Sequence, residues 1–360
     1  MLSGHSLTVL SFRSGTYAGL LRGFSGGLHP IVSNVDLHNH VIPPTILEAV
    51  RRDPHRFGLR LEESGGRMYL ERGGHARLEV LPAFYDIEAK IESMDRMQLD
   101  IAALSMAPPG FFYSLGAEAG LAAARLGNDG IAQMVAKHPS RLRGMATLPM
   151  QDPDAAIVEL ERVVKEYGFR AVEVGTSIEG RQLSDPSLRS VLKSIEQLGC
   201  LLFAHPYTCV AKGGMEAYNL MILMGYPIDT TIMLAHLMLS GALEDLRDLR
   251  ILTAHGGGVM PYLVGRFTHL HRSRADLRAK APTSPADLLR RLYFDALLND
   301  PIAIRHLVNE VGADHVVIGT DHPYDVGPAL PVAEIEKVPG LSEAERRAIC
   351  GETALRLLGE

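Results

Sequence analysis

Short apolar runs alternate with longer amphipathic stretches along most of this chain of 360 residues. Runs that are β-branched or almost continuously apolar are typical of parallel strands buried on both faces. Eight such runs predict strands, around residues 34–40, 101–107, 143–150, 171–176, 200–205, 251–255, 292–296 and 316–321. Between them, the stretches 86–98, 116–137 and 154–167 carry apolar residues three and four apart, which predicts helices.

The ends of several predicted helices carry the expected boundary residues. Asp152 and Asp185 each precede a proline, a pair that caps a helix and starts its first turn. Gly168 and Gly199 stand where helices are expected to end. Strands that alternate with helices form a parallel sheet, and eight such units predict a (β/α)₈ TIM barrel.

The chain is longer than the barrel needs, because a typical barrel takes about 250 residues. Residues 51–85 do not fit a simple βα unit and predict a small hairpin insertion after strand 1. Residues 207–240 are Gly-rich at first and then apolar, and they predict a helical insertion after strand 5. We therefore expect an N-terminal extension, 1–33, and a single barrel domain, 34–360.

Composition narrows the classes of partner. With a net charge of −6 and a pI near 6.2, the chain has no general electrostatic attraction to nucleic acid or to an anionic membrane. No uninterrupted apolar stretch reaches the roughly 18 residues of a membrane span. The three cysteines form no CxxC pair, so neither a disulfide framework nor a cysteine zinc site is indicated, and a reducing, cytoplasmic location is expected.

The first 35 residues contain no Asp or Glu and two Arg. This composition is similar to that of a weak transit peptide. An ordered N-terminal arm or an upstream start codon also explains it, and these two interpretations are favoured over a transit peptide. The sequence leaves the role of this segment open.

Candidate chemistry begins at the end of the first predicted strand, with His38 and His40. Side chains two apart on a strand point to the same face, so both imidazoles are expected at the barrel mouth. Functional side chains in barrels stand at the C-terminal ends of strands. Taken alone, the pair is also compatible with two polar residues at a strand–loop junction.

Three other strand ends carry similar residues. His205 follows four apolar residues and precedes a proline, His255 precedes three glycines, and Asp321 ends the eighth predicted strand. Such residues on four different strands, all at one end, are hard to explain by packing alone. Imidazoles with a carboxylate suit Zn²⁺ or another divalent metal. Because this set of candidate ligands contains no cysteine, a catalytic site with open coordination positions is expected.

At this point the chain resembles the amidohydrolase superfamily, and within it the branch of aminocarboxymuconate-semialdehyde decarboxylase. The similarity covers roughly residues 34–358. It rests on the combination of four segments that carry candidate ligands, 36–40, 202–206, 254–258 and 319–323. Four connecting segments also resemble the family, at 94–95, 146–152, 261–266 and 293–296.

The resemblance implies that His38, His40, His205 and Asp321 hold one Zn²⁺ ion per chain, and that His255 is the catalytic histidine. Many amidohydrolases carry a carbamylated lysine on strand 4 that bridges two metals. Strand 4 here, residues 171–176, has no lysine, which favours one metal. The hypothesis for the reaction combines metal-activated water with His255 as general base.

Substrate-binding residues are predicted less directly. The resemblance implies that Arg266 reaches the site of a neighbouring subunit, which predicts a homodimer, and that Arg274 matches a second family arginine. Arg77 is one position away from a third. All three are also compatible with solvated surface positions. The chain has no Trp, and Tyr207 and Tyr218 stand where the family decarboxylase has tryptophans, so both are expected to line the substrate pocket.

Three functions remain open at this stage. The first is a zinc-dependent decarboxylase of a small unsaturated or aromatic carboxylate. The second uses the same site to hydrate an unsaturated oxo-acid or to hydrolyse a lactone or amide, because metal-activated water serves all these reactions. The third is a non-catalytic protein on an enzyme fold, which the complete set of candidate ligands argues against.

Overall fold

The computed structural model describes residues 33–53, 57–72, 77–209 and 213–360. The N-terminal extension expected at 1–33 therefore lies, except for its last residue, outside the described residues.

The central sheet confirms the predicted barrel. Its eight strands follow the order β1-β5-β6-β7-β10-β11-β12-β13, and every neighbouring pair is parallel. Single bridges between Asp36 and Ile318 and between Asn39 and His322 join the two edge strands and close the barrel. The strands are β1 (Val35–Val41), β5 (Ile101–Met106), β6 (Leu142–Thr147), β7 (Ala171–Gly175), β10 (Leu201–His205), β11 (Arg250–Thr253), β12 (Tyr293–Asp295) and β13 (Val316–Val317).

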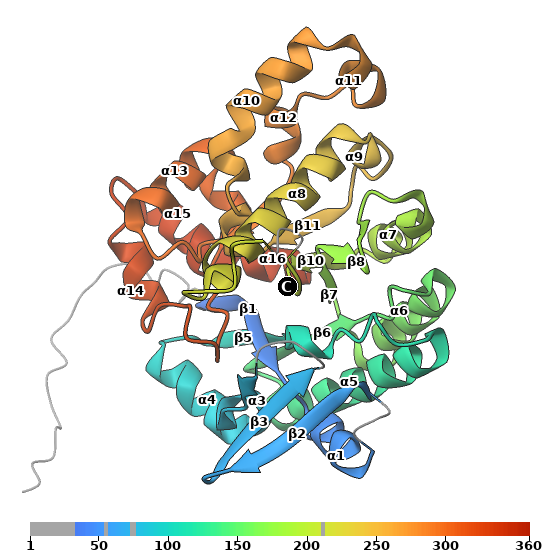
Figure 1. Ribbon diagram of the computed structural model, residues 1–360. Coiled ribbons are helices and arrows are strands. Elements are labelled where there is room, and N and C mark those ends of the chain that lie inside the picture. Colours follow the sequence, from blue (N-terminus) through green and yellow to red (C-terminus); the bar gives the residue numbers. More distant parts are fainter. Residues whose placement is uncertain (1–32, 54–56, 73–76, 210–212) are drawn as a thin grey trace, which may run out of the picture. The chain divides into compact units, whose positions relative to one another are not determined.

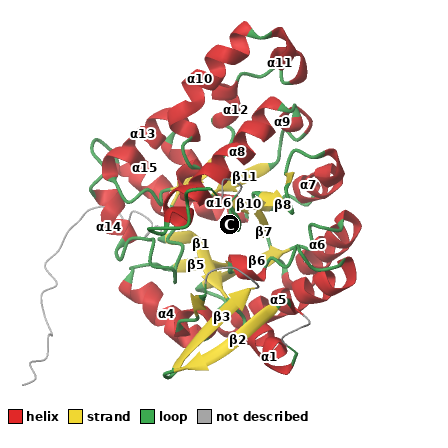
Figure 2. Ribbon diagram, viewed as in Figure 1, coloured by secondary structure: helices red, strands yellow, loops and turns green. Residues whose placement is uncertain are grey.

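Helices surround these strands (Figure 2). They are α1 (Pro44–Arg52), α3 (Pro82–Tyr85), α4 (Ile87–Arg96), α5 (Ala117–Lys137), α6 (Pro153–Tyr167), α7 (Arg189–Gln197), α8 (Tyr226–Leu239), α9 (Ala242–Asp245), α10 (Met260–Ser273), α11 (Ala275–Lys280), α12 (Pro285–Leu289), α13 (Pro301–Val311), α14 (Pro331–Glu336), α15 (Glu343–Arg347) and α16 (Thr353–Leu358). The predicted boundaries hold for α6: the Asp152 carboxylate accepts from the Ala155 N–H, and Gly168 ends the helix with φ of 68°.

Both predicted insertions are present (Figure 1). The first contains an antiparallel sheet of β2 (Leu59–Ser64), β3 (Arg67–Arg72) and β4 (Leu78–Glu79), so the expected hairpin gains a third strand. In the second, a π-helical turn, Met221–Gly225, leads directly into α8. A further short pair, β8 (Ser177–Ile178) and β9 (Arg181–Gln182), follows β7.

The helical run Met221–Leu239 corrects one expectation. Within the described residues it is the one helix long and apolar enough to span a membrane, with a mean hydropathy of 1.4. The sequence count missed it because Asp229 and two threonines interrupt the apolar residues. A core helix passes the same test, and 44% of this run is buried inside the fold, so the finding is weak evidence for a membrane span.

The barrel interior is apolar below and polar at its mouth. Val35 and Leu37 of β1 pack in a buried cluster with Phe203 of β10. Between Asp36 and Asn39 the register of β1 shifts, and such an irregularity re-aims side chains. His38 then lies against the Phe203 ring, 4.9 Å between centroids. Because of this shift, the same strand carries apolar residues inside the barrel and a histidine pair at its mouth.

Candidate active site

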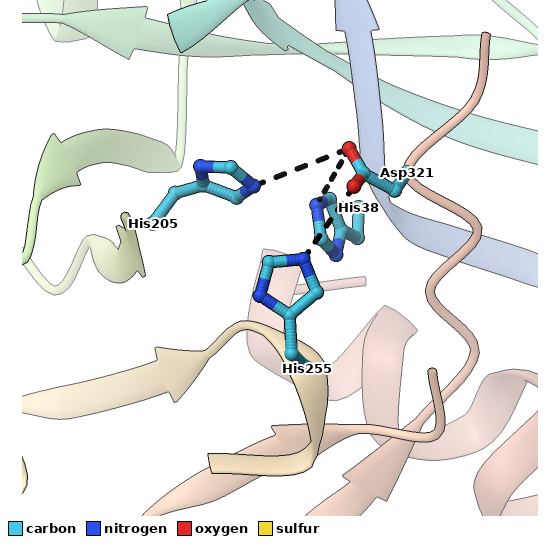
Figure 3. A group of neighbouring side chains, drawn as sticks. All are labelled: His38, His205, His255 and Asp321. Atoms are coloured by element: carbon cyan, nitrogen blue, oxygen red, sulfur yellow. Dashed lines mark hydrogen bonds and ion pairs between the residues drawn. The ribbon is translucent and has the colours of Figure 1, made fainter. Parts of the chain in front are cut away.

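Four residues from four segments converge at the barrel mouth (Figure 3). His38 stands on β1, His205 ends β10, and His255 and Asp321 follow β11 and the eighth strand. His255 and Asp321 both have φ of 56°, a left-handed conformation that costs energy for residues other than glycine. Such strain is typical of functional positions, where the surrounding structure holds a side chain in place.

The Asp321 carboxylate lies at the centre of the cluster. Its Oδ1 atom is 2.9 Å from Nε2 of His40, 3.3 Å from Nε2 of His38 and 4.0 Å from Nε2 of His205. Its Oδ2 atom is instead 3.4 Å from Nε2 of His255. The carboxylate therefore faces the three expected metal-binding imidazoles with one oxygen and the expected catalytic imidazole with the other.

The buried ligand atoms fit a divalent cation. Nε2 of His38, His40 and His205 and Oδ1 of Asp321 have no hydrogen-bond partner among the described residues. The four side chains are buried, with Asp321 the most exposed at 8%. Burying polar atoms without partners is costly. A cation at their meeting point satisfies all four at once, and three imidazoles with a carboxylate are a donor set that zinc accepts.

Two overlapping groups within the described residues have ligand atoms close enough to share an ion. One is His38, His205, His255 and Asp321, and the other is His40, Glu173 and His205. His205 belongs to both, and His40 also contacts Asp321. His255 differs from the other imidazoles because its Nε2 forms a hydrogen bond with Asp321 and its side chain is 14% exposed. These differences favour a role beside the ion rather than on it.

Neighbouring groups fix which ring nitrogen of His38 and of His40 faces the proposed ion. Nδ1 of His38 is 2.6 Å from Oδ2 of Asp295, and Nδ1 of His40 is 3.1 Å from Oγ of Ser105. The Ser105 hydroxyl donates to the Asn39 carbonyl, so its oxygen accepts from His40. Both Nδ1 atoms thus carry a proton, which leaves Nε2 free to coordinate.

Asp295 is a further residue beside the cluster that the sequence analysis did not single out. Besides His38, its carboxylate accepts from the backbone N–H groups of His255, at 2.9 Å, and Gly256, at 2.7 Å. One buried carboxylate therefore orients a metal-binding imidazole and the turn that carries His255. Asp295 could have been identified from the sequence by its position at the end of β12, because the candidate metal ligands also stand at strand ends.

Lys90 of α4 is a second residue that the sequence analysis did not single out. Its fully buried ammonium donates to Oδ1 of Asn39, at 2.7 Å, and to the His40 carbonyl, at 2.9 Å, and lies 3.2 Å from Nδ1 of His322. Burial lowers the pKa of Lys90 to about 7. The ammonium joins the end of β1 to the segment after Asp321. A lone lysine in an amphipathic helix gives no sequence signal of such a role.

Asp36 makes a similar connection lower in the barrel. Its carboxylate accepts from the His38 N–H at 3.0 Å and from the Thr320 hydroxyl at 2.6 Å. Burial raises the pKa of Asp36. The strand that carries His38 and the residue before Asp321 are thereby held together.

The imidazoles of the cluster differ in their pKa values. Burial lowers the pKa of His38, but Asp321 and Asp295 outweigh it and the net value is about 10. Burial lowers the pKa of His40 to about 4 and that of His205 well below its ordinary value. For Asp321, burial opposes ionisation, yet the surrounding imidazoles hold its pKa well below the usual range. The cluster thus has one ionised carboxylate and two imidazoles that stay neutral.

Strand 4 of the barrel carries a carboxyl group where a bridging lysine was sought. Glu173 of β7 is fully buried, and its Oε1 lies 3.6 Å from Nδ1 of His40. Neither of its carboxyl oxygens has a hydrogen-bond partner among the described residues. Burial raises the pKa of Glu173 well above its ordinary value. Strand 4 therefore carries a buried carboxyl group, Glu173, and no lysine.

The predicted substrate-binding arginines lie on the surface of the chain. Arg266 is exposed on α10, and Arg274, also exposed, directly follows this helix. Arg77 pairs with Oε1 of Glu62 at 3.0 Å and stacks on the Tyr69 ring of the inserted sheet. Their roles toward substrate stay predictions.

The two predicted tyrosines have different surroundings. The Tyr207 hydroxyl donates to Oε1 of Glu179 at 3.4 Å, and its ring packs edge-to-face on Tyr113. Tyr218 is 87% exposed. The structure thus places Tyr207 in the buried wall beside β7 and Tyr218 on the surface before the π-helical turn.

Comparison with known proteins supplies the family. The amidohydrolase family profile matches residues 35–359. The chain belongs to the amidohydrolase family. It is 32% identical over 335 residues to the 2-amino-3-carboxymuconate-6-semialdehyde decarboxylase of Dictyostelium discoideum, covering 90% of this chain and 91% of the relative. It is 27% identical over 279 residues to the gamma-resorcylate decarboxylase of a Polaromonas species, covering 73% and 84%.

Solved structures agree on the fold. The 5-carboxyvanillate decarboxylase of Sphingomonas paucimobilis superimposes with a TM-score of 0.77 at 23% identity, covering 91% of this amidohydrolase and 99% of that chain. The dihydroxybenzoic acid decarboxylase of Polaromonas, solved with bound manganese and 2-nitroresorcinol, gives 0.74 at 23% identity, covering 91% and 97%. With the curated relatives, the family assignment identifies this amidohydrolase as a metal-dependent decarboxylase of the aminocarboxymuconate-semialdehyde decarboxylase branch.

Proposed function

We propose that this amidohydrolase is a zinc-dependent carbon–carbon lyase that removes CO₂ from a small unsaturated or aromatic carboxylate. One observation carries the proposal: three imidazole nitrogens and one carboxylate oxygen, all buried and without hydrogen-bond partners, meet beside His255. The names of the curated relatives support decarboxylation. Manganese, which the Polaromonas enzyme binds, is the alternative ion.

His38, His40, His205 and Asp321 would hold the ion, and their second contacts would keep them in place. A divalent ion there supplies a Lewis acid for a substrate oxygen and lowers the pKa of water. Asp295 keeps Nε2 of His38 directed at the site. Ser105 does the same for His40. The protein thus presents a preorganised set of ligands rather than ordering them when the ion arrives.

His255 would move the proton. Its Nε2 is hydrogen-bonded to Oδ2 of Asp321, and its backbone N–H is held by Asp295. As the most exposed imidazole of the cluster, it is the one that substrate can reach. General acid–base catalysis by a positioned histidine contributes about 10²- to 10⁴-fold to the rate.

The substrate carboxylate needs a cationic partner, and Arg266 and Arg274 are proposed for it, with Arg77 as a third candidate. Arginine suits this role because its planar fork pairs with both oxygens of a carboxylate. Arg266 lies exposed on α10, as a side chain that enters the site of a second copy must. We therefore propose a homodimer. Cys200 and Cys350 form no disulfide among the described residues, which is compatible with the proposed cytoplasmic location.

The test is release of CO₂ by the zinc- or manganese-loaded protein. The panel contains the substrates named by its relatives: 2-amino-3-carboxymuconate semialdehyde, gamma-resorcylate and 5-carboxyvanillate. At least one acid should lose CO₂, and His255→Asn should reduce kcat by about 10² or more. His269→Gln, at an exposed position of α10, is the matched control. Addition of water without CO₂ release would instead indicate a hydratase or hydrolase.

A further inference from the structure

Tyr324 adjoins the metal-binding cluster and was not singled out from the sequence. Its backbone N–H donates to the Asp321 carbonyl at 2.9 Å, so the two residues share one tight turn. Its ring packs edge-on against the His40 ring, with centroids 5.6 Å apart, and against Phe84, at 5.2 Å. The ring is therefore fixed between a proposed metal ligand and the apolar core.

Tyr226 lies near the site in the second insertion, which contains α8. It is the first residue of α8, and the first turn of this helix lies against the glycine loop after His255. The Thr231 hydroxyl accepts from the Val259 N–H at 2.9 Å. A Cβ atom on Gly258 would lie 2.1 Å from the Pro227 carbonyl oxygen. This close approach leaves no room for a side chain between the helix and the loop, so the first turn of α8, which begins with Tyr226, lies directly beside the His255 loop.

The hydroxyl groups of these two tyrosines share one property. No hydrogen bond of either hydroxyl is found among the described residues, and both side chains are half-buried. Neither hydroxyl is among the fully buried atoms that lack a partner, so both remain accessible to a ligand. Fully enclosed tyrosine hydroxyls usually find a partner within the protein. Nearby Tyr113 does so, since its hydroxyl accepts from the Gly175 N–H. Tyr207 does so through Glu179.

Both phenols remain protonated and can donate. Burial, followed by the nearby Asp321 carboxylate, raises the pKa of Tyr226 to about 12 and that of Tyr324 well above its ordinary value. Each therefore offers one O–H within reach of the Asp321 charge, which contributes to both shifts. Neutral donors beside a carboxylate suit an oxygen acceptor on a ligand.

We propose that Tyr226 and Tyr324 form a donor pair that determines specificity by binding a hydroxyl or oxo oxygen next to the reacting carboxylate of the substrate. The inference rests on the proposed function and narrows it to oxygenated acids, such as hydroxybenzoates or oxo-acids. A site built to hydrogen-bond a substrate oxygen discriminates strongly against analogues without it, because its own polar groups are then left unpaired.

The experiment compares two inert ligands, so that turnover does not interfere. Dissociation constants of 2-nitroresorcinol and nitrobenzene are measured by calorimetry on the metal-loaded protein. Both carry a nitro group in place of a carboxylate, and only the first has hydroxyl oxygens. We expect the wild type to bind 2-nitroresorcinol at least tenfold more tightly. Tyr226→Phe and Tyr324→Phe should each weaken it about tenfold and change nitrobenzene binding less than twofold.

Tyr262→Phe is the control, because this tyrosine of α10 is 81% exposed. Metal content and melting temperature are measured on each variant, and both should match the wild type. Equal changes for both ligands, no change in either variant, an effect of only one tyrosine, or no binding by the wild type would each overturn the proposal. Because binding is measured and not CO₂ release, a chain that shows this pattern but releases no CO₂ would contradict only the proposed function.

Discussion

The Asp295 carboxylate connects the expected metal ligand His38 to the turn that carries His255. Groups behind metal-binding histidines typically account for 10- to 100-fold in metal affinity. Asp295→Asn keeps the shape of the side chain but removes its charge. We expect metal affinity to fall by about 10- to 100-fold, measured by competition with a chromogenic chelator.

Asp300→Asn provides the control for this variant. Asp300 also accepts backbone hydrogen bonds, at the start of α13, but it has no contact with the cluster among those of the described residues. The Asp300→Asn substitution should leave the metal affinity unchanged. Equal affinities of the Asp295 variant and the wild type would show that His38 needs no orienting carboxylate.

The raised pKa of His38 predicts how metal binding depends on pH. With a pKa near 10, the His38 imidazole of the apoprotein is protonated at pH 7. A metal-bound imidazole must be neutral at the coordinating nitrogen, so binding releases about one proton. Affinity should therefore rise about tenfold per pH unit from neutrality toward pH 10.

Calorimetry in buffers with different ionisation enthalpies measures this proton directly. His40 and His205, whose pKa values are lowered, should contribute none at pH 7. The Asp295→Asn variant should release less, because Asp295 helps to raise the pKa of His38. Binding enthalpies that are independent of the buffer would contradict the assignment.

At the scale of elements, the site depends on how closely α8 packs on the glycine loop. Gly258 has φ of 64°, and an added Cβ would meet the backbone of Pro227 at 2.1 Å. Gly258→Ala should therefore destabilise the fold by more than about 1 kcal/mol, measured by denaturant unfolding, and should also lower activity by displacing His255.

Gly265→Ala is the matched control on the neighbouring helix α10. A Cβ there would meet nothing within 4 Å. Alanine is favoured over glycine inside a helix by about 1 kcal/mol, so this variant should be as stable as the wild type or more so. Similar unfolding of both variants would refute the close packing of α8 on the loop.

Elements and site residues differ in how far the sequence reveals them. Apolar runs and helical periodicity located the eight strands because burial on both faces dictates composition. The eighth was expected over 316–321 but ends at Val317. Beyond it the Thr320 N–H donates to the Asp36 carboxylate and the Asp321 N–H to the His38 carbonyl, in place of a regular ladder.

The sequence identified the candidate metal ligands at strand ends, but it did not identify the residues that orient them. His38, His40, His205 and Asp321 converge as their spacing indicated. Asp295 ends β12 and could have been found by the same strand-end criterion, although its contact with His38 spans 257 residues of sequence. Lys90 depends on a contact with His40 across 50 residues of sequence, which no local pattern encodes. Tyr226 and Tyr324 are defined by what surrounds their hydroxyls, and only the folded chain shows this.

At the scale of the whole molecule, the proposed homodimer has a consequence for Arg266. If it serves the neighbouring subunit's site, mixed dimers of two inactive variants contain one intact site. Mixing His255→Asn with Arg266→Ala after dissociation should then restore activity toward about a quarter of the wild type, as expected for random pairing of a C₂ dimer. No recovery, or an active monomer by light scattering, would place Arg266 outside the site.

The central claim is that one divalent ion is held by His38, His40, His205 and Asp321. Elemental analysis of the purified protein, comparing wild type with His205→Ala, tests it most directly. The account predicts about one zinc or manganese per chain in the wild type and little in the variant. Two ions per chain would indicate that Glu173 is a further ligand, and a metal-free wild type that binds none when zinc or manganese is supplied would contradict the proposed reaction.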